Sequence, residues 1–165
     1  MTTTLPMAGP SQMQQAVIDS TQCVFSTMLG CQVHVVAGEC QADSLESSDL
    51  SSTIGMTGDI TGTVILHLSQ SVAVGIAETL LGQPIDGIND DVRDVTGELA
   101  NLIAGNAKER MENKAIVLGL PTIICGPKHR IFFEPGVTVQ DLSFQTPWGQ
   151  LHIQLAFRDT SKHTN

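Results

Sequence analysis

The spacing of apolar residues along the chain predicts three helices. The first covers residues 11 to about 29, where valine and methionine side chains recur near helical spacing. The second covers about 70–82 and ends at Gly82, and the third covers about 90–113 with Asn89 as its N-terminal cap. The aspartates that open the third helix lie where the helix dipole favours negative charge. Two of the three helices therefore lie in the middle of the chain.

Strands are predicted before and after the two central helices. A hairpin is indicated at 51–69, with its turn at Gly58–Asp59. The last strand alternates cleanly, which predicts one buried face and one polar face. A slip in the alternation between Val139 and Leu142 predicts a β-bulge near Asp141. The predicted strands outside the hairpin lie at 31–36, 121–125, 129–134, 136–145 and 149–159.

The order of these elements predicts the fold class. Helix, strands, two helices and strands fit an α+β fold, in which helices pack on a mostly antiparallel sheet. A single domain over 11–158 is expected, with flexible tails at 1–10 and 159–165. The polar, acidic stretch 38–49 is predicted to be a loop or an irregular sheet edge.

Composition and charge narrow the range of functions. Hydrophobic residues make up 41% of the 165 residues and charged residues 15%, so a sizeable core is expected. The net charge of −9 argues against nucleic acid or an anionic membrane as a partner, because both attract clustered Lys and Arg. No apolar run approaches the roughly 20 residues that span a bilayer. Without a signal-peptide pattern or a CxxC pair, the four cysteines are interpreted as reduced thiols of a cytoplasmic protein.

The third helix contains the stretch GELANLIAGNAKERM (97–111), which keeps two glycines at helical positions. Glycine costs about 1 kcal/mol relative to alanine inside a helix, so Gly97 and Gly105 need a reason. On a helical projection both flank Asn101, with Glu98 beside it, on the side opposite the apolar stripe. The pattern predicts an open trough with an amide at its floor. The stripe itself consists of Val92, Val95, Leu99, Leu102 and Ile103.

Two interpretations of this surface remain open. In the first, Glu98 and Asn101 only solvate an exposed helix face, and the glycines let a neighbouring element pack closely. In the second, the missing side chains let another protein approach. An amide is neither acid nor base near neutral pH, but it donates and accepts hydrogen bonds and can orient a water molecule. Glu98 could anchor a cation on the docked protein.

Around this helix the chain resembles the CheC/CheX/FliY phosphatases of bacterial chemotaxis, and CheX most closely. The motif of that family is Asp or Ser, three residues, Glu, two residues, Asn and, about twenty residues later, Pro. Here it reads Asp94, Glu98, Asn101 and Pro121, and the stretches GELANLIAGN, LPTIICG and IGMTGDITGTVILHLS are also similar. CheC and FliY carry the motif twice, but the first helix here has no Glu-x-x-Asn. The resemblance therefore implies a single site.

The resemblance implies an enzyme that hydrolyses the aspartyl phosphate of a CheY-type response regulator. By this analogy Asn101 positions the attacking water, Glu98 forms an ion pair with a lysine of the regulator, and Asp94 supports the interface or the helix start. The other residues assigned to partner binding are Gly97, Gly105 and Pro121. The Mg²⁺ belongs to the phosphorylated regulator, so no cofactor of the chain's own is expected, and the family implies a homodimer. Such a reaction relies on positioning, without covalent chemistry by the chain.

Two other functions compete with the enzyme. One is a non-catalytic adaptor of the same fold that binds a response regulator or a flagellar component. The presence of both Glu98 and Asn101 favours the enzyme over this adaptor. The other is a structural domain that oligomerises through a sheet edge, for which the alternating last strand is the candidate.

The histidines and Cys125 do not indicate a second active site. None of the histidines is paired at i, i+4 with another ligand, so polar-face or hydrogen-bonded roles are favoured over metal binding. Cys125 is interpreted as a strand residue because no basic group is placed to activate its thiol.

Overall fold

The chain alternates helices and strands in the predicted order, and the computed structural model describes residues 10–36, 48–112 and 114–159. The elements are α1 (Pro10–Val24), a π-helical turn η1 (Phe25–Leu29), β1 (His34–Val35), β2 (Leu50–Gly58), β3 (Ile60–Leu68), α3 (Gln70–Leu81), α4 (Asp90–Arg110), β4 (Ile116–Leu118), β5 (Thr122–Cys125), β6 (Thr138–Thr146) and β7 (Gly149–Asp159). Pro10 and Asp159, assigned to the tails by the sequence, belong to α1 and β7. The rest of the predicted tails, and the predicted loop 38–49 except its last two residues, lie outside the described residues.

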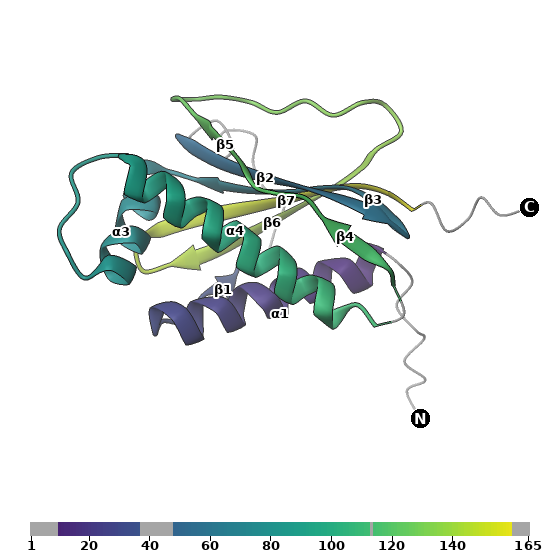
Figure 1. The fold of residues 1–165 in the computed structure, drawn as a ribbon, viewed down its shortest axis with the longest axis horizontal. Coiled ribbons are helices and arrows are strands. Elements are labelled where there is room, and N and C mark those ends of the chain that lie inside the picture. Colours follow the sequence, from purple (N-terminus) through teal and green to yellow (C-terminus); the bar gives the residue numbers. More distant parts are fainter. Residues whose placement is uncertain (1–9, 37–47, 113, 160–165) are drawn as a thin grey trace, which may run out of the picture.

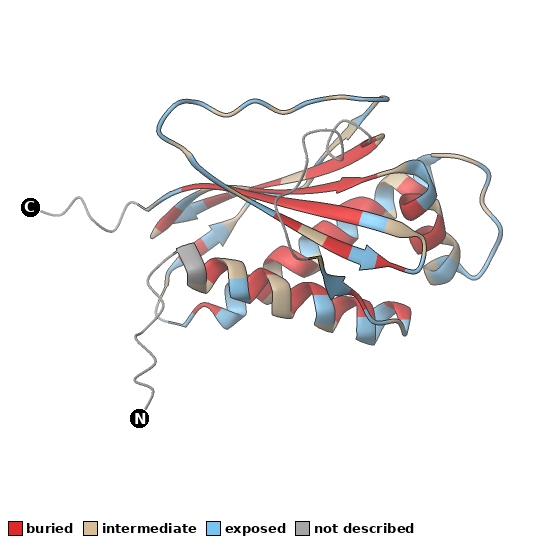
Figure 2. Cartoon of the chain, turned by 180° about the vertical axis from the view of Figure 1, so that it is seen from behind, coloured by how far each residue is buried: buried red, intermediate tan, exposed pale blue. Residues whose placement is uncertain are grey.

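Within the described residues, seven strands form one sheet in the order β1-β6-β7-β3-β2-β4, with β5 also paired to β2. Every pair is antiparallel. Helices α1, α3 and α4 lie on one face of this sheet (Figure 1). The core fills the space between helices and sheet, where Phe25, Ile54 and Phe144 have no exposed surface (Figure 2). The predicted α+β architecture is confirmed.

Local signals set the helix ends. The Ser69 side chain accepts a hydrogen bond from Val72 N at the start of α3, and Gly82 ends that helix in the left-handed conformation, with φ of 66°. At α4, Asn89 Oδ1 accepts a hydrogen bond from Val92 N at 3.0 Å. The predicted helix end at Gly82 and the predicted cap at Asn89 are confirmed. None of the described helices has both the length and the apolar character that crossing a membrane requires.

The stretch 126–137, here called the far-face segment, crosses the sheet on the face opposite the helices (Figure 1). The apolar run at 129–134 predicts a strand, but no strand forms there. The prediction is wrong because this stretch lies over a sheet face and not beside a sheet edge, so no neighbouring strand is aligned with its backbone.

The pairing of β6 with β7 is continuous. The register runs without interruption from Thr138 opposite Phe157 to Thr146 opposite Gly149, so the bulge predicted near Asp141 is absent. Val139 lines a cavity beneath the far-face segment. The slip in the alternation therefore reflects an apolar residue on the outer face of an unbroken strand.

The last strand is central and not an edge. β7 lies between β6 and β3, and residues 151–157 are buried on both faces. The prediction that this strand is an edge available for oligomerisation is therefore wrong. Among the described strands, β1 lies at one edge of the sheet and β4 and β5 at the other.

A bulge does occur, but at the sheet edge formed by β4 and β5. β4 stops pairing with β2 at Leu118 and β5 resumes at Thr122. Across this gap the three residues 119–121 face only two residues of β2, which is the definition of a bulge. Proline has no N–H to contribute to a ladder, so Pro121 suits this break. The bulge turns Leu120 outwards, where 89% of its surface is exposed.

Candidate active site

Helix α4 is held rigidly along one side. Val92, Leu99 and Ile103 are buried in the core, and Val95 and Leu102 are partly buried against it, so the predicted apolar stripe is confirmed. α1 lies beside α4 (Figure 1), and Ser20 Oγ donates a hydrogen bond to Ile103 O at 2.6 Å. A helix fixed in this way presents its opposite face in a defined position.

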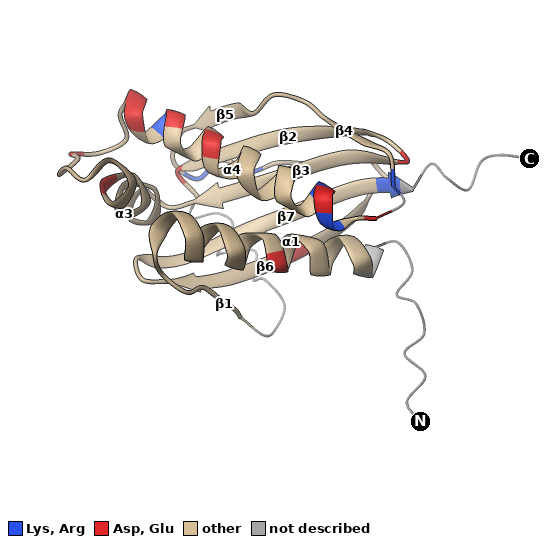
Figure 3. Cartoon of the chain, turned by 60° about the horizontal axis from the view of Figure 1, so that its bottom comes forward, with Lys and Arg blue, Asp and Glu red and all other residues tan. Residues whose placement is uncertain are grey.

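The opposite face of α4 carries the three residues of the motif. Asp94, Glu98 and Asn101 are all exposed and follow one another at intervals of about one turn. No hydrogen bond or ion pair with another described residue engages the side chain of Glu98 or Asn101. Figure 3 shows that acidic residues predominate on the first half of α4, where Arg93 is paired with Asp90. This half of the helix therefore attracts a basic partner surface.

The two glycines of α4 occupy different environments. A methyl group at Gly97 would lie 3.4 Å from Ile123 Cδ1 and 3.7 Å from Pro121 Cγ, and Gly97 itself is buried. The predicted open trough is therefore wrong at Gly97, because Ile123 and Pro121 cover this position at ordinary contact distance. At Gly105, one turn after Asn101, nothing lies within 4 Å of the methyl position. The predicted open space is confirmed on that side of Asn101.

The segment that follows α4 is hydrogen-bonded to the turn between β2 and β3. Ala115 N donates to Asp59 Oδ2 at 2.8 Å, and Asp59 N donates to Ala115 O at 2.8 Å. These bonds direct β4 along β2, and the bulge that follows brings Pro121 against α4. The motif proline is thus placed one turn from Asn101, beside Gly97.

Leu120 is the surface residue that sequence reasoning missed. It is almost fully exposed and immediately precedes Pro121, which packs on α4. No local pattern marks it, because only the shift in register between β4 and β5 turns its side chain outwards. It adds an apolar contact to an otherwise acidic surface.

The remaining candidates lie away from α4 or offer no site. His67 and His152 are buried and hydrogen-bonded, which agrees with the hydrogen-bonded roles that the sequence favours for histidines. Cys125 ends β5 as a strand residue, and it is a free thiol, as are Cys23 and Cys31; Cys40 lies outside the described residues. The expectation that no basic group lies near Cys125 is wrong, because the guanidinium of Arg93 on α4 interacts with its thiol. In the described part of the chain no three His, Cys, Asp or Glu side chains are grouped so as to hold a metal ion.

The described residues thus form an α+β domain that displays an exposed Glu-x-x-Asn pair on a helix, with a proline packed against the same helix beside Gly97. A family model described as "Chemotaxis phosphatase CheX" matches residues 50–141 of the chain. The chain belongs to the CheX family.

Solved structures share this fold. The chemotaxis protein CheX from Vibrio vulnificus is 23% identical with a TM-score of 0.79, covering 88% of this chain and 96% of that chain. A chemotactic CheC-like protein from Shewanella oneidensis is 25% identical with a TM-score of 0.77, covering 89% and 98%. A chain of the CheX–CheY–BeF₃–Mg²⁺ complex from Borrelia burgdorferi is 19% identical with a TM-score of 0.74, covering 88% and 97%. A comparison with curated proteins finds no match.

Proposed function

We propose that the protein is a phosphatase that hydrolyses the aspartyl phosphate of a CheY-type response regulator. Asn101 positions the attacking water and Glu98 anchors the regulator. The observation that carries the proposal is the exposed Glu98–Asn101 pair, which has no partner among the described residues and stands on a helix fixed by the core. Membership of the CheX family supports the activity, and the complex of a similar CheX with CheY supports the partner.

In this reaction the chain itself forms no covalent bond with the phosphoryl group. Water attacks the phosphorus, the bond between phosphorus and the aspartyl oxygen breaks, and inorganic phosphate leaves while the regulator's carboxylate is restored. The Asn101 amide can accept a hydrogen bond from the water through its oxygen and so hold it in line with the breaking bond. The Mg²⁺ that neutralises phosphate charge would be bound by the regulator. The gain in rate comes from fixing the water, which otherwise approaches at random.

The surface around Asn101 suits insertion into another protein. The carboxylates on the first half of α4 favour a basic partner surface, and in this proposal the exposed Glu98 meets a lysine of that surface. Gly105 leaves open space on one side of the Asn101 amide. The exposed Leu120 lies at the sheet edge, next to Pro121. Asp94, one turn before Glu98, adds to the negative charge of the docking surface.

The direct test uses a CheY-type regulator phosphorylated by a small phosphodonor. After the donor is removed, loss of the phosphoryl group is followed with and without this protein. The proposal requires faster loss when the protein is present. Binding to the phosphorylated regulator without faster loss would contradict it and would favour the adaptor of the same fold.

The variant Glu98→Gln is expected to weaken binding to the regulator about tenfold, equivalent to ~1.4 kcal/mol, because an ion pair at the interface is lost. The dissociation constant, measured by calorimetry at two salt concentrations, should also depend less on salt than that of the wild type. Glu109→Gln, which removes the same charge from an exposed position later on α4, is the matched control. Equal effects of the two variants would show that only net charge matters.

The variant Gly105→Ala is expected to raise the stability of the fold and to weaken binding of the regulator. Because nothing lies within 4 Å of the added methyl group, the variant should be more stable by about 1 kcal/mol in urea unfolding. If a partner approaches through this space, the same methyl group should weaken regulator binding. Unchanged binding would show that the partner does not use the space beside Gly105.

A further inference from the structure

A set of polar side chains is buried on the outer face of the sheet, opposite the helices. Ser51 on β2 is 0% exposed, His67 on β3 is 3% exposed and Gln154 on β7 is 7% exposed. Hydrogen bonds join them into one linear set that reaches from the far-face segment to β6. This set, here called the polar chain, consists in order of Gly126, His129, Ser51, His67, Gln154 and Asp141.

The first half of the polar chain attaches the far-face segment to the sheet. His129 Nδ1 lies 2.7 Å from the carbonyl oxygen of Gly126, so this nitrogen carries the hydrogen and donates. His129 Nε2 lies 2.6 Å from Ser51 Oγ. The same hydroxyl oxygen lies 2.8 Å from His67 Nδ1. One serine hydroxyl is therefore shared between two imidazole rings.

The second half of the polar chain ends at a carboxylate. Gln154 Nε2 donates to Asp141 Oδ1 at 2.9 Å, which orients the amide. The amide oxygen of Gln154 then faces His67 Nε2 at 2.7 Å. Because a carbonyl oxygen only accepts, His67 Nε2 carries the hydrogen, and its Nδ1 must accept from Ser51 when the ring is neutral.

When both imidazole rings are neutral, the polar chain has one hydrogen fewer than its hydrogen bonds require. Its five contacts need five hydrogens, and both of its ends, a carbonyl and a carboxylate, supply none. Two neutral imidazoles supply one hydrogen each, the serine one, and the amide one towards the carboxylate. No choice of tautomer or amide orientation changes this total of four. In the neutral state one contact therefore brings two lone pairs together.

Burial decides which ring takes the missing proton. Desolvation lowers the pKa of His67, and the neighbouring His129 and His152 lower it further, while the hydrogen bond that His67 donates to Gln154 and the charge of Asp141 raise it. Because the net effect lowers the pKa of His67, this ring is the less favourable place for the added proton. His129 is only partly buried, in the far-face segment, so its charge remains close to water.

The charged groups around His129 come from several elements. Arg130 and His129 both line the cavity of about 210 Å³, so the guanidinium opposes a positive charge on the ring. Asp141 on β6 lies at the other end of the polar chain. Burial lowers the pKa of His152 on β7, and the charge of Asp141 raises it. Asp49, just before β2, has its carboxylate engaged with Gln70 N at the start of α3. These groups leave His129 as the site where the added proton completes the hydrogen bonding.

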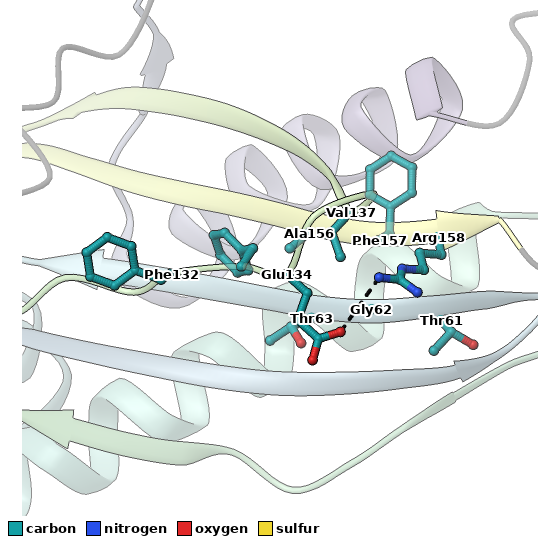
Figure 4. Close-up of a pocket in the computed structure, with 10 residues that line it drawn as sticks. Thr61, Gly62, Thr63, Phe132, Glu134, Val137, Ala156, Phe157 and Arg158 are labelled. Atoms are coloured by element: carbon teal, nitrogen blue, oxygen red, sulfur yellow. Dashed lines mark ion pairs between the residues drawn. The ribbon is translucent and has the colours of Figure 1, made fainter.

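The far-face segment depends on such polar anchors because it packs loosely. A cavity of about 390 Å³ lies between the segment and strands β3 and β7, lined by threonines, phenylalanines and Arg158 (Figure 4). Phe132 in the segment is 84% exposed. At the far end Arg158 holds the segment through Glu134, at 3.7 Å, and through the carbonyl oxygen of Pro135, at 3.2 Å.

We propose that the far-face segment is a pH-sensitive clamp. Uptake of one proton by the polar chain completes its hydrogen bonding and holds the segment against the outer face of the sheet, and loss of that proton loosens it. Because uptake of a proton is favoured at lower pH, the clamp closes as pH falls and opens as pH rises.

The test measures hydrogen exchange of the Gly126 amide, which is bonded to Asp49 O at 3.1 Å where the segment leaves β5. The carbonyl oxygen of the same residue is the first member of the polar chain. After correction for intrinsic exchange, the protection of this amide is expected to be roughly tenfold higher at about pH 5.5 than at about pH 8, because one hydrogen bond to a charged group is gained. Nitrogen NMR of the imidazoles should show both ring nitrogens of His129 protonated at the lower pH and His67 neutral with its hydrogen on Nε2.

Two variants separate the clamp from a merely structural role of His129. His129→Gln should abolish the pH dependence of Gly126 protection, whereas His34→Gln, at an exposed position on β1, should preserve it. A structural role would instead lower protection equally at both pH values. The proposal is overturned if wild-type protection does not increase at the lower pH, or if the dependence survives in His129→Gln.

Discussion

Replacing Asn101 by alanine is expected to reduce the phosphatase rate at least about a hundredfold, because the water would lose the group that fixes it in line with the breaking bond. Binding to the phosphorylated regulator should change little, since Glu98 and the surrounding surface remain. The fold should also be kept, because Asn101 is exposed and alanine is the residue most favourable to a helix. Single-turnover decay of the phosphorylated regulator measures the rate, and calorimetry measures the binding.

The matched control is Asn106→Ala, which removes an amide from a partly buried position on the same helix. It should leave the decay rate close to that of the wild type. A variant at Asn101 that still accelerates decay like the wild type would rule out the proposed role of this amide. Loss of binding together with loss of activity would make Asn101 a docking residue.

Replacing Gly62 by alanine is expected to destabilise the fold by about 3 kcal/mol or more, because the added carbon has no room in the middle of the sheet. The new Cβ would lie 2.6 Å from Phe157 Cα and 2.8 Å from Phe157 Cβ, and it would also strike the carbonyl oxygen of Ala156. β3 and β7 would have to separate at Gly62, which pairs directly with Phe157. Urea unfolding followed by circular dichroism measures the loss.

Gly55→Ala is the control for this prediction. Gly55 lies on β2, the other neighbour of β3, and nothing lies within 4 Å of its methyl position. The general cost of replacing a strand glycine is common to both variants, so only Gly62 should show the large loss. Similar stabilities for the two variants would contradict the close approach of β3 to β7.

The helices were predictable because their signals are local. The caps at Asn89 and Gly82 act within one turn of the chain, and the apolar stripe of α4 repeats at helical spacing. The same periodicity placed Glu98 and Asn101 on the exposed side of α4, and the structure agrees. The exposed pair that carries the proposed function was therefore available from sequence.

The strands were less predictable because pairing is not local. An apolar run such as 129–134 looks the same whether it lies beside a strand or over a sheet face. Likewise, alternation in the last strand does not reveal that β7 has neighbours on both sides and is buried on both faces. Whether a strand is central or at an edge depends on the order of strands in the sheet, which arises from contacts between distant residues.

Local sequence was thus sufficient for the fold class, for the helix caps and for the Glu98–Asn101 face, because each depends on the spacing of neighbouring residues. Tertiary structure alone decided that Gly97 is covered by Pro121 and that Leu120 is turned outwards, since both follow from the shift in register between β4 and β5. It also decided the polar chain, whose members lie far apart in sequence and meet only when four strands and the far-face segment are assembled. Hydrogen-bond geometry acts over about 3 Å, and only folding brings such residues that close.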